Sequence, residues 1–386
     1  MWMSQMTVLP LFICLSLSIL LAYSLCHRGN VAAHKDLLVW AIAATLLYSG
    51  HCAFFNLEVD QMPFYDSVYV MCNLAVFPLY FVYLSRLTEG RVTLWAKFWA
   101  YVLPFAVGLP VAFLYLAMSP RELHEFIWSY LYHGHFQGME GVCLAQAIVH
   151  HVARAIFAVG VVLTMVLGIR KIRNYNNLID SIYSDTEDKK LHSFESILKW
   201  LLLMCVLSVV ANALGRYAFS NSVGMLALAF LPFSALLLAL GIVGYRQRFS
   251  YCDIVLPQDT TPEVAEESDD PGEGASRVNQ ELVDKIKELM KENVFLTPNL
   301  KVSDLAKRLG TNDRYVQQAL NEGMGMSFAE LINRCRVDYA EKLMKSNSGI
   351  CISDVYIQSG FSSQSAFYRN FKRYKNYSPK SIMQQQ

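Results

Sequence analysis

Two kinds of hydrophobic pattern divide this chain of 386 residues. Up to residue 249, long apolar runs alternate with short polar loops, whereas the last third of the chain has shorter, amphipathic runs. A helix of about 20 apolar residues crosses a hydrocarbon core of about 30 Å. The sequence therefore predicts an all-α first part, a bundle of seven transmembrane helices over residues 7–25, 37–55, 67–87, 98–118, 145–169, 198–219 and 223–245.

Lysine and arginine are distributed unequally between alternate loops of this bundle. With the N-terminus outside, thirteen of these side chains lie on the inner side, and only Arg121 and Arg216 lie on the outer side. Inner loops of membrane proteins carry the excess of positive charge. We therefore expect a multi-pass protein in the lipid bilayer of the cell inner membrane, with its N-terminus outside. After seven spans, the C-terminal domain would lie in the cytoplasm.

Residues 277–386 have the 3.6-residue periodicity of short amphipathic helices and predict an all-helical soluble domain. Ser303 is expected to cap a first short helix, Gly310 turns the chain, and Asn312 begins a second helix that ends near Leu320. A short helix, a glycine turn and a second helix make a helix-turn-helix unit, whose second helix enters the major groove of DNA.

A second unit of the same kind follows about fifty residues later. Ser353 is expected to cap its first helix, Gly360 turns the chain, and residues 363–374 form its second helix, while a longer helix over residues 328–344 connects the two units. Such a connection presents two reading helices to major-groove segments about one duplex turn apart. The predicted core includes Tyr315, Leu320, Phe361, Phe367 and Phe371.

The spaced motifs of the two units resemble the DNA-binding domain of AraC/XylS-family transcriptional regulators over about residues 280–383. In the first unit they are Leu-Ala and Leu-Gly within residues 305–310 and Gly-x-Ser-Phe at 325–328, followed by Arg336 and Ala340. In the second unit they are Gly-Phe-x-Ser at 360–363, then Phe367, Arg369, Phe371 and Lys372, and Ser-Pro at 378–379.

The chain departs from the family pattern at two positions. Tyr356 stands where the family usually has alanine, which is expected to alter how that helix packs on its reading helix. Asn376 replaces the usual glycine before Ser-Pro, a mild change because asparagine tolerates the left-handed conformation at a helix end.

The resemblance and the helix geometry together imply a set of DNA-binding residues. Arginine binds guanine and glutamine binds adenine through two hydrogen bonds each, whereas basic residues near the helix end bind phosphates. The expected contacts to double-stranded DNA are Arg314, Gln317, Gln318, Gln364, Ser365, Tyr368, Arg369, Lys372 and Arg373. One such domain covers about ten base pairs, so we expect a homodimer.

Charge separates three regions. Residues 1–249 hold 16 Lys/Arg and 13 Asp/Glu, residues 250–276 hold none and 8, and residues 277–386 hold 17 and 11. The middle region also contains proline and glycine and lacks apolar periodicity, which predicts a flexible acidic linker between a sensor domain and the DNA-binding domain. This linker either masks the basic domain in the absence of a signal or is simply a soluble spacer.

Ionisable side chains interrupt the fifth predicted span at His150, His151 and Arg154. An arginine inside a membrane is costly and normally faces a polar interior or an anionic partner. The pattern predicts a ligand pocket in the outer half of the bundle, with Arg216 nearby. The other interpretations are a hydrogen-bond network internal to the bundle and snorkelling of these side chains toward the headgroups.

The predicted function is a bacterial, sequence-specific transcription regulator in which the membrane domain senses a small molecule or a membrane signal. Nucleophile motifs, phosphate-binding glycine loops and metal-ligand spacings are missing from the sequence, so we expect neither an enzyme nor a cofactor or metal. Histidines in the outer loop over 119–144 fit ordinary solvated side chains.

Two other functions stay open. In the first, a transporter-like membrane domain carries the DNA-binding domain, although no carboxylate lies inside the seven predicted spans. In the second, the membrane domain is a passive anchor from which proteolysis releases the DNA-binding domain. Two structural questions also stay open: whether residues 170–199 are a relay or a solvated connector, and whether Cys52 and Cys143 form a disulfide.

Overall fold

The computed structural model describes residues 2–27, 32–56, 61–213, 223–247, 249–254, 280–347 and 349–383, which are helical apart from loops and one isolated bridge. The described chain forms two compact units. Residues 1–173 and 191–253 form the first unit, and residues 174–190 and 254–386 form the second. Most of the predicted linker, residues 255–276, lies outside the described residues.

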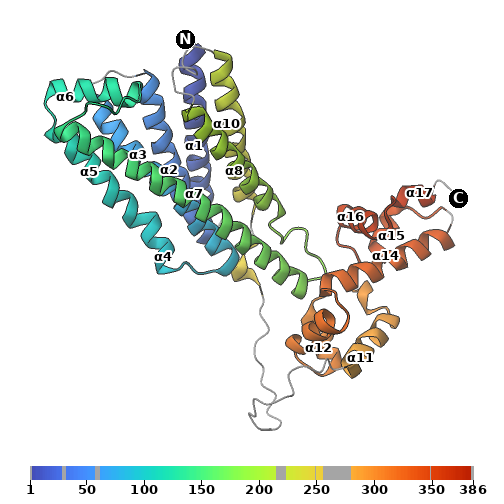
Figure 1. Ribbon diagram of the computed structural model, residues 1–386. Coiled ribbons are helices and arrows are strands. Elements are labelled where there is room, and N and C mark those ends of the chain that lie inside the picture. The colour runs from blue at the N-terminus through green and yellow to red at the C-terminus, as the bar shows by residue number, and fades with distance from the viewer. Residues whose placement is uncertain are drawn as a thin grey trace, which may run out of the picture. The chain divides into compact units, whose positions relative to one another are not determined.

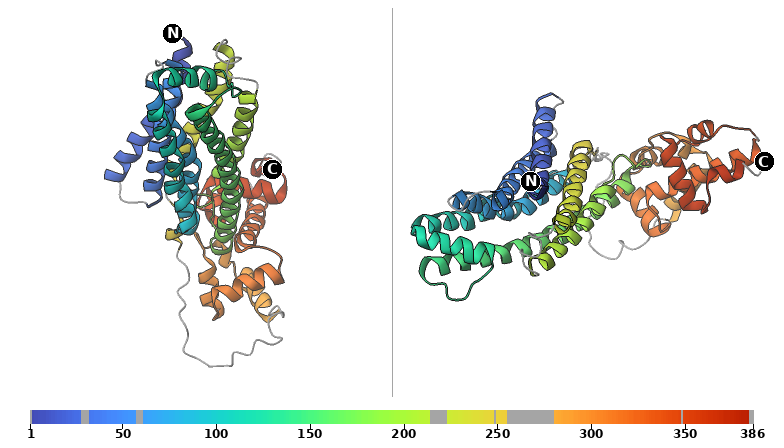
Figure 2. Two further views of the ribbon diagram at one scale, coloured as in Figure 1. Left: turned by 60° about the vertical axis from the view of Figure 1, so that its left-hand side comes forward. Right: turned by 90° about the horizontal axis from the view of Figure 1, so that it is seen from above.

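Long helices that pack lengthwise make up most of the first unit (Figures 1 and 2). In chain order its elements are α1 (Trp2–His27), α2 (Ala32–Asn56), α3 (Met62–Glu89), α4 (Leu94–Lys97), η2 (Phe98–Val102), α5 (Leu103–Ala117), α6 (Pro120–Glu125), η3 (Phe126–Tyr132), α7 (Gly141–Ile182), α8 (His192–Ala213), α10 (Val223–Arg246) and η4 (Tyr251–Asp253). Helix α7 begins in the first unit, and its last turns belong to the second.

Five helices of the described chain are long and apolar enough to cross a membrane. They cover Val8–Cys26, Ala33–Phe54, Met62–Glu89, Leu94–Ala117 and Gly141–Ile182, and correspond to the first five predicted spans. The sixth and seventh predicted spans fall on α8 and α10, and residues 214–222 between these helices lie outside the described residues. The structure thus supports five of the seven spans.

Three of these membrane-length helices extend further than the apolar pattern predicts and take in carboxylates, including Asp180 near the end of α7. Helix α2 includes Asp36, which forms an ion pair with Arg86, and α3 includes Asp66, which pairs with His150. No carboxylate lies inside the seven predicted ranges, but the helices reach beyond those ranges and include these three aspartates. The predicted ranges are too short because a hydropathy window ends at a charge, whereas the helix continues where a partner neutralises that charge.

One hydrophobic core of the first unit joins four segments. Met62, Val70 and Leu74 of α3 are buried against Val111 and Tyr115 of α5. Aromatic and aliphatic residues of η3 and the first turns of α7 complete this cluster. Cys143 belongs to it as a free thiol, so the structure has no disulfide between Cys143 and Cys52.

The second unit consists of short helices around one longer helix, α14 (Phe328–Ser346), with α11 and α12 toward one end and α15 to α17 toward the other (Figure 1). Its remaining elements are α11 (Gln280–Lys291), η5 (Val294–Leu296), α12 (Val302–Leu309), α13 (Asp313–Gln318), η6 (Ala319–Gly323), α15 (Ile352–Gln358), α16 (Gln364–Lys375) and α17 (Pro379–Met383). Val337, Ala340 and Met344 of α14 are buried in a core with Phe367 and Phe371 of α16.

Turn and cap residues place the two helix-turn-helix units. Gly310 and Gly360 have φ of 67° and 79°, and Asn376 ends α16 with φ of 64°, as the left-handed cap requires. Two predicted caps are wrong. Helices α12 and α15 begin at residues 302 and 352, so Ser303 and Ser353 lie inside their first turns rather than before them.

Candidate functional site

The first reading helix, α13, begins at a capped N-terminus. The Asn312 side chain accepts a hydrogen bond of 3.1 Å from the Tyr315 backbone N–H, and Gly310 makes the turn from α12. Val316 is buried, which fixes the opposite face of the helix outward. This outward face presents Arg314, which is exposed, with Gln317 and Gln318 half-buried beside it.

The sequence predicted Tyr315 in the core, and this prediction is wrong. Tyr315 lies on the outward face of α13. Its side chain is 55% exposed, whereas Leu320 is buried as predicted. Position 315 follows directly on Arg314 and precedes the buried Val316, so helical spacing alone would have placed it at the edge of the core. Its ring and hydroxyl are a further candidate for a DNA contact.

The second reading helix, α16, has a similar construction. The Ser363 side chain caps it by accepting a 3.2 Å hydrogen bond from the Ala366 N–H. Phe367 and Phe371 are fully buried and anchor one face. Along the other face lie the exposed predicted DNA contacts Gln364, Ser365, Arg369, Lys372 and Arg373.

Tyr368 differs from the other predicted contacts on α16. It is half-buried and packs against the core of the second unit, edge-to-face with Phe367 at 5.8 Å between ring centroids. Lys372 and Arg373 form no ion pair with any residue that the structure describes. Their charges are therefore available to phosphates.

Helix α14 holds the two helix-turn-helix units together through a buried arginine. Arg336 is 1% exposed, and its guanidinium donates 2.7 Å hydrogen bonds to the backbone oxygens of Phe295 and Thr297. The guanidinium also lies 5.7 Å from the centre of the Phe361 ring, in the second helix-turn-helix unit. The motif residue Arg336 thus has a structural position, away from the reading faces.

The segment 174–190 belongs to the same compact unit as the reading helices. The Ser184 backbone N–H donates to the Leu300 oxygen at 3.1 Å, and the side-chain amide of Asn333 donates to the Ser184 oxygen at 2.9 Å. Glu187 lies 3.2 Å from Arg369 as an ion pair. Part of the predicted inner loop is therefore packed against the helix-turn-helix domain, which the sequence left undecided.

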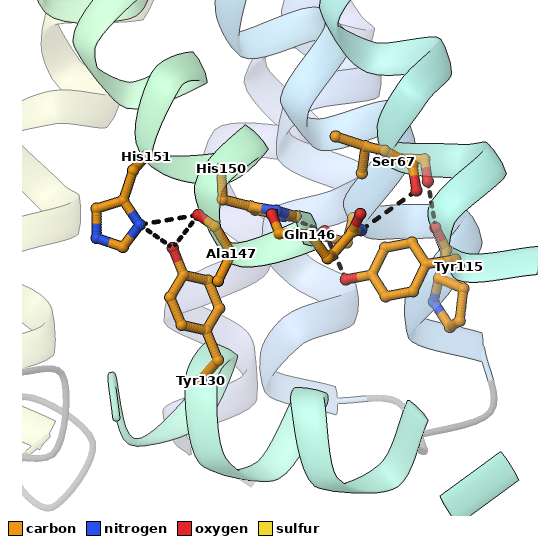
Figure 3. A network of polar contacts seen from close by, with 10 residues as sticks. Ser67, Tyr115, Tyr130, Gln146, Ala147, His150 and His151 are labelled. Carbon is orange, nitrogen blue, oxygen red and sulfur yellow. Dashed lines mark hydrogen bonds and ion pairs between the residues drawn. The ribbon is translucent and has the colours of Figure 1, made fainter. Parts of the chain in front are cut away.

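The first unit contains a buried polar network on α3, α5 and α7 (Figure 3). Asp66 accepts a 2.8 Å hydrogen bond from the Tyr115 hydroxyl, and one of its oxygens lies 2.8 Å from His150 Nε2. The other ring nitrogen, Nδ1, lies 2.8 Å from the backbone oxygen of Gln146. Both ring nitrogens face acceptors, so a doubly protonated His150 satisfies both contacts and pairs with the Asp66 carboxylate.

The remaining predicted pocket residues lie around Tyr130. The hydroxyl of Tyr130 is 3.0 Å from His151 Nδ1, and the Arg154 guanidinium is 5.4 Å from its ring centre. His150 is 4% exposed, whereas His151 and Arg154 are exposed. The structure thus separates a buried His150 from its two neighbours, with Tyr130 between them. Arg216 lies outside the described residues.

Sequence reasoning missed Asp66, Tyr115 and Tyr130 in this network. Asp66 and His150 are 84 positions apart, and only the packing of α3 on α7 brings them together. A weak signal existed: an aspartate directly before a long apolar run, with a histidine inside another. Among the described residues, no group of His, Cys, Asp and Glu is arranged to hold a metal ion.

Comparison with known proteins bears on the second unit alone. Residues 305–385 match the family described as "Helix-turn-helix domain". The TCP pilus virulence regulatory protein of Vibrio cholerae is 35% identical over 101 residues, which is 26% of this chain and 35% of that protein. An uncharacterized HTH-type transcriptional regulator of Staphylococcus aureus is 30% identical over 82 residues, 21% of this chain and 11% of that protein.

In each match, most of this chain and most of the relative remain unaligned. The chain spans about a tenth of the Staphylococcus protein and about a third of the Vibrio protein. No solved structure matches the chain significantly. The similarity therefore identifies the C-terminal domain and leaves the role of the whole chain to its own residues.

Proposed function

From the AraC-type helix-turn-helix domain in residues 305–385, we propose that the chain is a membrane-embedded bacterial transcription regulator that binds specific DNA sequences. One observation carries the proposal. Two helix-turn-helix units share one compact unit, and the second helix of each has an outward face with arginine and glutamine side chains. These are the side chains that distinguish guanine and adenine in the major groove.

Both reading helices contact bases, and the second one also contacts phosphates. Arg314 and Gln318 on α13, and Gln364 and Arg369 on α16, are the base contacts of the proposal. Lys372 and Arg373, in the last turns of α16, bind phosphates and orient the domain. The regulator acts as a homodimer, because a single domain reads too few base pairs to define a unique site.

The first unit supplies membrane attachment and signal input. Five membrane-length helices support embedding in the inner membrane, and the excess of inner lysine and arginine supports a cytoplasmic DNA-binding domain. Helix α7 is a single helix of 42 residues that runs from a candidate span into the second unit. A signal that shifts the bundle between two states therefore has a continuous element through which to act.

The signal is sensed at the polar network of Asp66, Tyr115 and His150, with Tyr130 linking it to His151 and Arg154. A buried ion pair among membrane-length helices is energetically costly, and such pairs are usually kept because they have a function. In this proposal an anionic ligand binds the exposed side chains of His151 and Arg154, and Tyr130 transmits the change to His150. An Arg154→Ala protein would then bind DNA normally and fail to respond.

The buried Asp66–His150 pair also favours a second function, a transporter-like membrane domain, because proton carriers use such pairs. Reconstitution in liposomes separates the two. A regulator shows no proton flux, whereas a transporter shows a flux that Asp66→Asn abolishes. The anchor function is separated by immunoblotting of cell fractions, since only proteolytic release produces a soluble C-terminal fragment.

The test of the proposed function is selection from a random duplex library by the full-length protein in lipid nanodiscs. We expect enrichment of a motif with two elements about one helical turn apart. An Arg314→Ala/Arg369→Ala protein should enrich nothing. Lys342→Ala, which removes one exposed charge from α14, should enrich the same motif as the unmodified protein. A library that stays random with the unmodified protein would refute the proposal.

A further inference from the structure

The segment after α7 is fixed to the second unit by backbone contacts. Tyr183 pairs with Lys301 as an antiparallel bridge, and the next residue, Ser184, donates its N–H to the Leu300 oxygen. Tyr183 and Ser184 are 5% and 1% exposed. Asn333 of α14 holds the Ser184 oxygen, so the segment is bound from two sides. A chain held in this way is a docked element and not a solvated connector.

From this position the segment reaches both reading helices. On α13, the Gln317 side-chain amide donates to the Ser181 oxygen at 3.4 Å. On α16, the Ser365 hydroxyl donates to the Glu187 carboxylate at 3.4 Å, and Arg369 is paired with the same carboxylate. Three of the nine side chains expected to contact DNA are therefore engaged by residues 181–187.

The contacts on α16 have the chemistry of a DNA contact. A carboxylate beside a guanidinium and a hydroxyl presents the negative charge and acceptor oxygens that a phosphate would present. An Arg369 side chain that is paired with Glu187 cannot at the same time place its donors on a guanine edge. Occupation of this surface by Glu187 and by DNA is mutually exclusive.

Resting on the proposed function, we propose that residues 181–187 are an internal competitor for the DNA-reading surface formed by Gln317, Ser365 and Arg369. The segment begins in the last turn of α7, the helix that also forms the fifth candidate span. A change at α7 therefore moves or releases Glu187 and exposes Arg369 to DNA. The occupant of the undocked surface is double-stranded DNA.

The contact is weak enough to be released. Arg369 keeps 64% of its side chain exposed, and the two hydrogen bonds to the segment on the reading helices are long, at 3.4 Å. Burial raises the pKa of Glu187, although the Arg369 guanidinium opposes this shift. The ionised carboxylate is thus held at a desolvation cost, which weakens the contact that DNA must replace.

The test measures DNA affinity of the full-length protein in nanodiscs by fluorescence anisotropy, with a labelled mixed-sequence duplex of about 30 base pairs. Glu187→Gln keeps the shape of the side chain and removes its charge. We expect its Kd to fall about two- to fivefold, the range of a partly exposed ion pair. Asp188→Asn is the matched control, because it removes the same charge from the exposed neighbouring residue.

A double-mutant cycle with Arg369→Ala makes the test specific. If Glu187 competes through Arg369, Glu187→Gln should tighten binding in the unmodified background and much less in the Arg369→Ala background. Equal effects of Glu187→Gln and Asp188→Asn, or equal effects of Glu187→Gln in both backgrounds, would overturn the inference while DNA binding stands. Absence of duplex binding by every protein would overturn the proposed function and the inference together.

Discussion

The guanidinium of Arg336 donates a 2.7 Å hydrogen bond to the backbone oxygen of Phe295, a residue 41 positions earlier in the chain. This contact, with a second one to Thr297, ties the helix between the two helix-turn-helix units to the segment before the first. Burial lowers the pKa of Arg336 to about 10, so the side chain remains charged at neutral pH. The relative placement of the two reading helices depends on this buried cation.

We expect Arg336→Ala to destabilise the second unit by about 3 kcal/mol, because it opens a cavity and leaves two buried carbonyls unsatisfied. All six tryptophans lie at or before residue 200, so their fluorescence does not report on this unit. Amide hydrogen exchange of α14 at increasing urea measures its opening free energy instead. Unchanged hydrogen exchange in the variant would show that Arg336 does not hold the two helix-turn-helix units together.

Two turn glycines should respond very differently to alanine. A Cβ at Gly360 would meet the Leu296 oxygen at 2.5 Å, in addition to the strain of φ 79°. At Gly310, with φ 67°, nothing lies within 4 Å of the added atom. By the same exchange assay, Gly360→Ala should cost about 3 kcal/mol or more and Gly310→Ala about 1 kcal/mol. Similar costs at both positions would contradict the close packing of Gly360 on Leu296.

The pH dependence of stability should reveal Glu341. Hydrogen bonds from Lys345 and Lys375 lower the pKa of Glu341 to about 2, with a further one from the Tyr377 hydroxyl. A lowered pKa of a carboxyl group stabilises the folded state above its ordinary value near 4.5, and this gain disappears as the pH falls toward 2.

Glu341→Gln should therefore lower the opening free energy of the second unit by about 1 kcal/mol at pH 7. The difference from the unmodified protein should shrink from about pH 5 downward. Glu288→Gln, on the exposed face of α11, should change stability by about 0.3 kcal/mol or less. A difference that is independent of pH would show that Glu341 is not ionised in these contacts.

Basic residues on the two reading helices should separate into two classes. Lys372→Ala should weaken binding to all duplexes alike and reduce the slope of log K against log salt by about 0.9. Arg314→Ala should cost about 1–3 kcal/mol at one base position and relax the sequence preference there. Anisotropy titrations at several salt concentrations, with duplexes varied one base at a time, distinguish these outcomes. Loss of sequence preference in the Lys372 variant would place that residue on a base.

Local signals in the sequence predicted the second unit well. Glycine at 310 and 360 and asparagine at 376 each specify a backbone conformation through their own side chain or lack of one, and the structure has each of them. The caps at Ser303 and Ser353 failed because a serine one position inside a helix start looks the same in sequence as a cap. Here the Asp304 carboxylate accepts from the Lys301 N–H instead.

Contacts between segments that are far apart in the chain could not be predicted from the sequence. Hydropathy began the third span after Asp66, because the partner that neutralises its charge, His150, lies 84 positions away. For the same reason the polar loop after α7 gave no sign that Glu187 meets Arg369. Tyr315 was placed in the core because aromatic residues usually are, whereas its actual position depends on which side of α13 the Val316 side chain faces.

A genome-wide map of DNA bound by the full-length protein in its host tests the central claim most directly. The account predicts discrete peaks that share a two-element motif, that disappear with Arg314→Ala/Arg369→Ala and that persist with Lys342→Ala. Peaks that are identical in the double variant, or an absence of specific peaks in every growth condition, would contradict it.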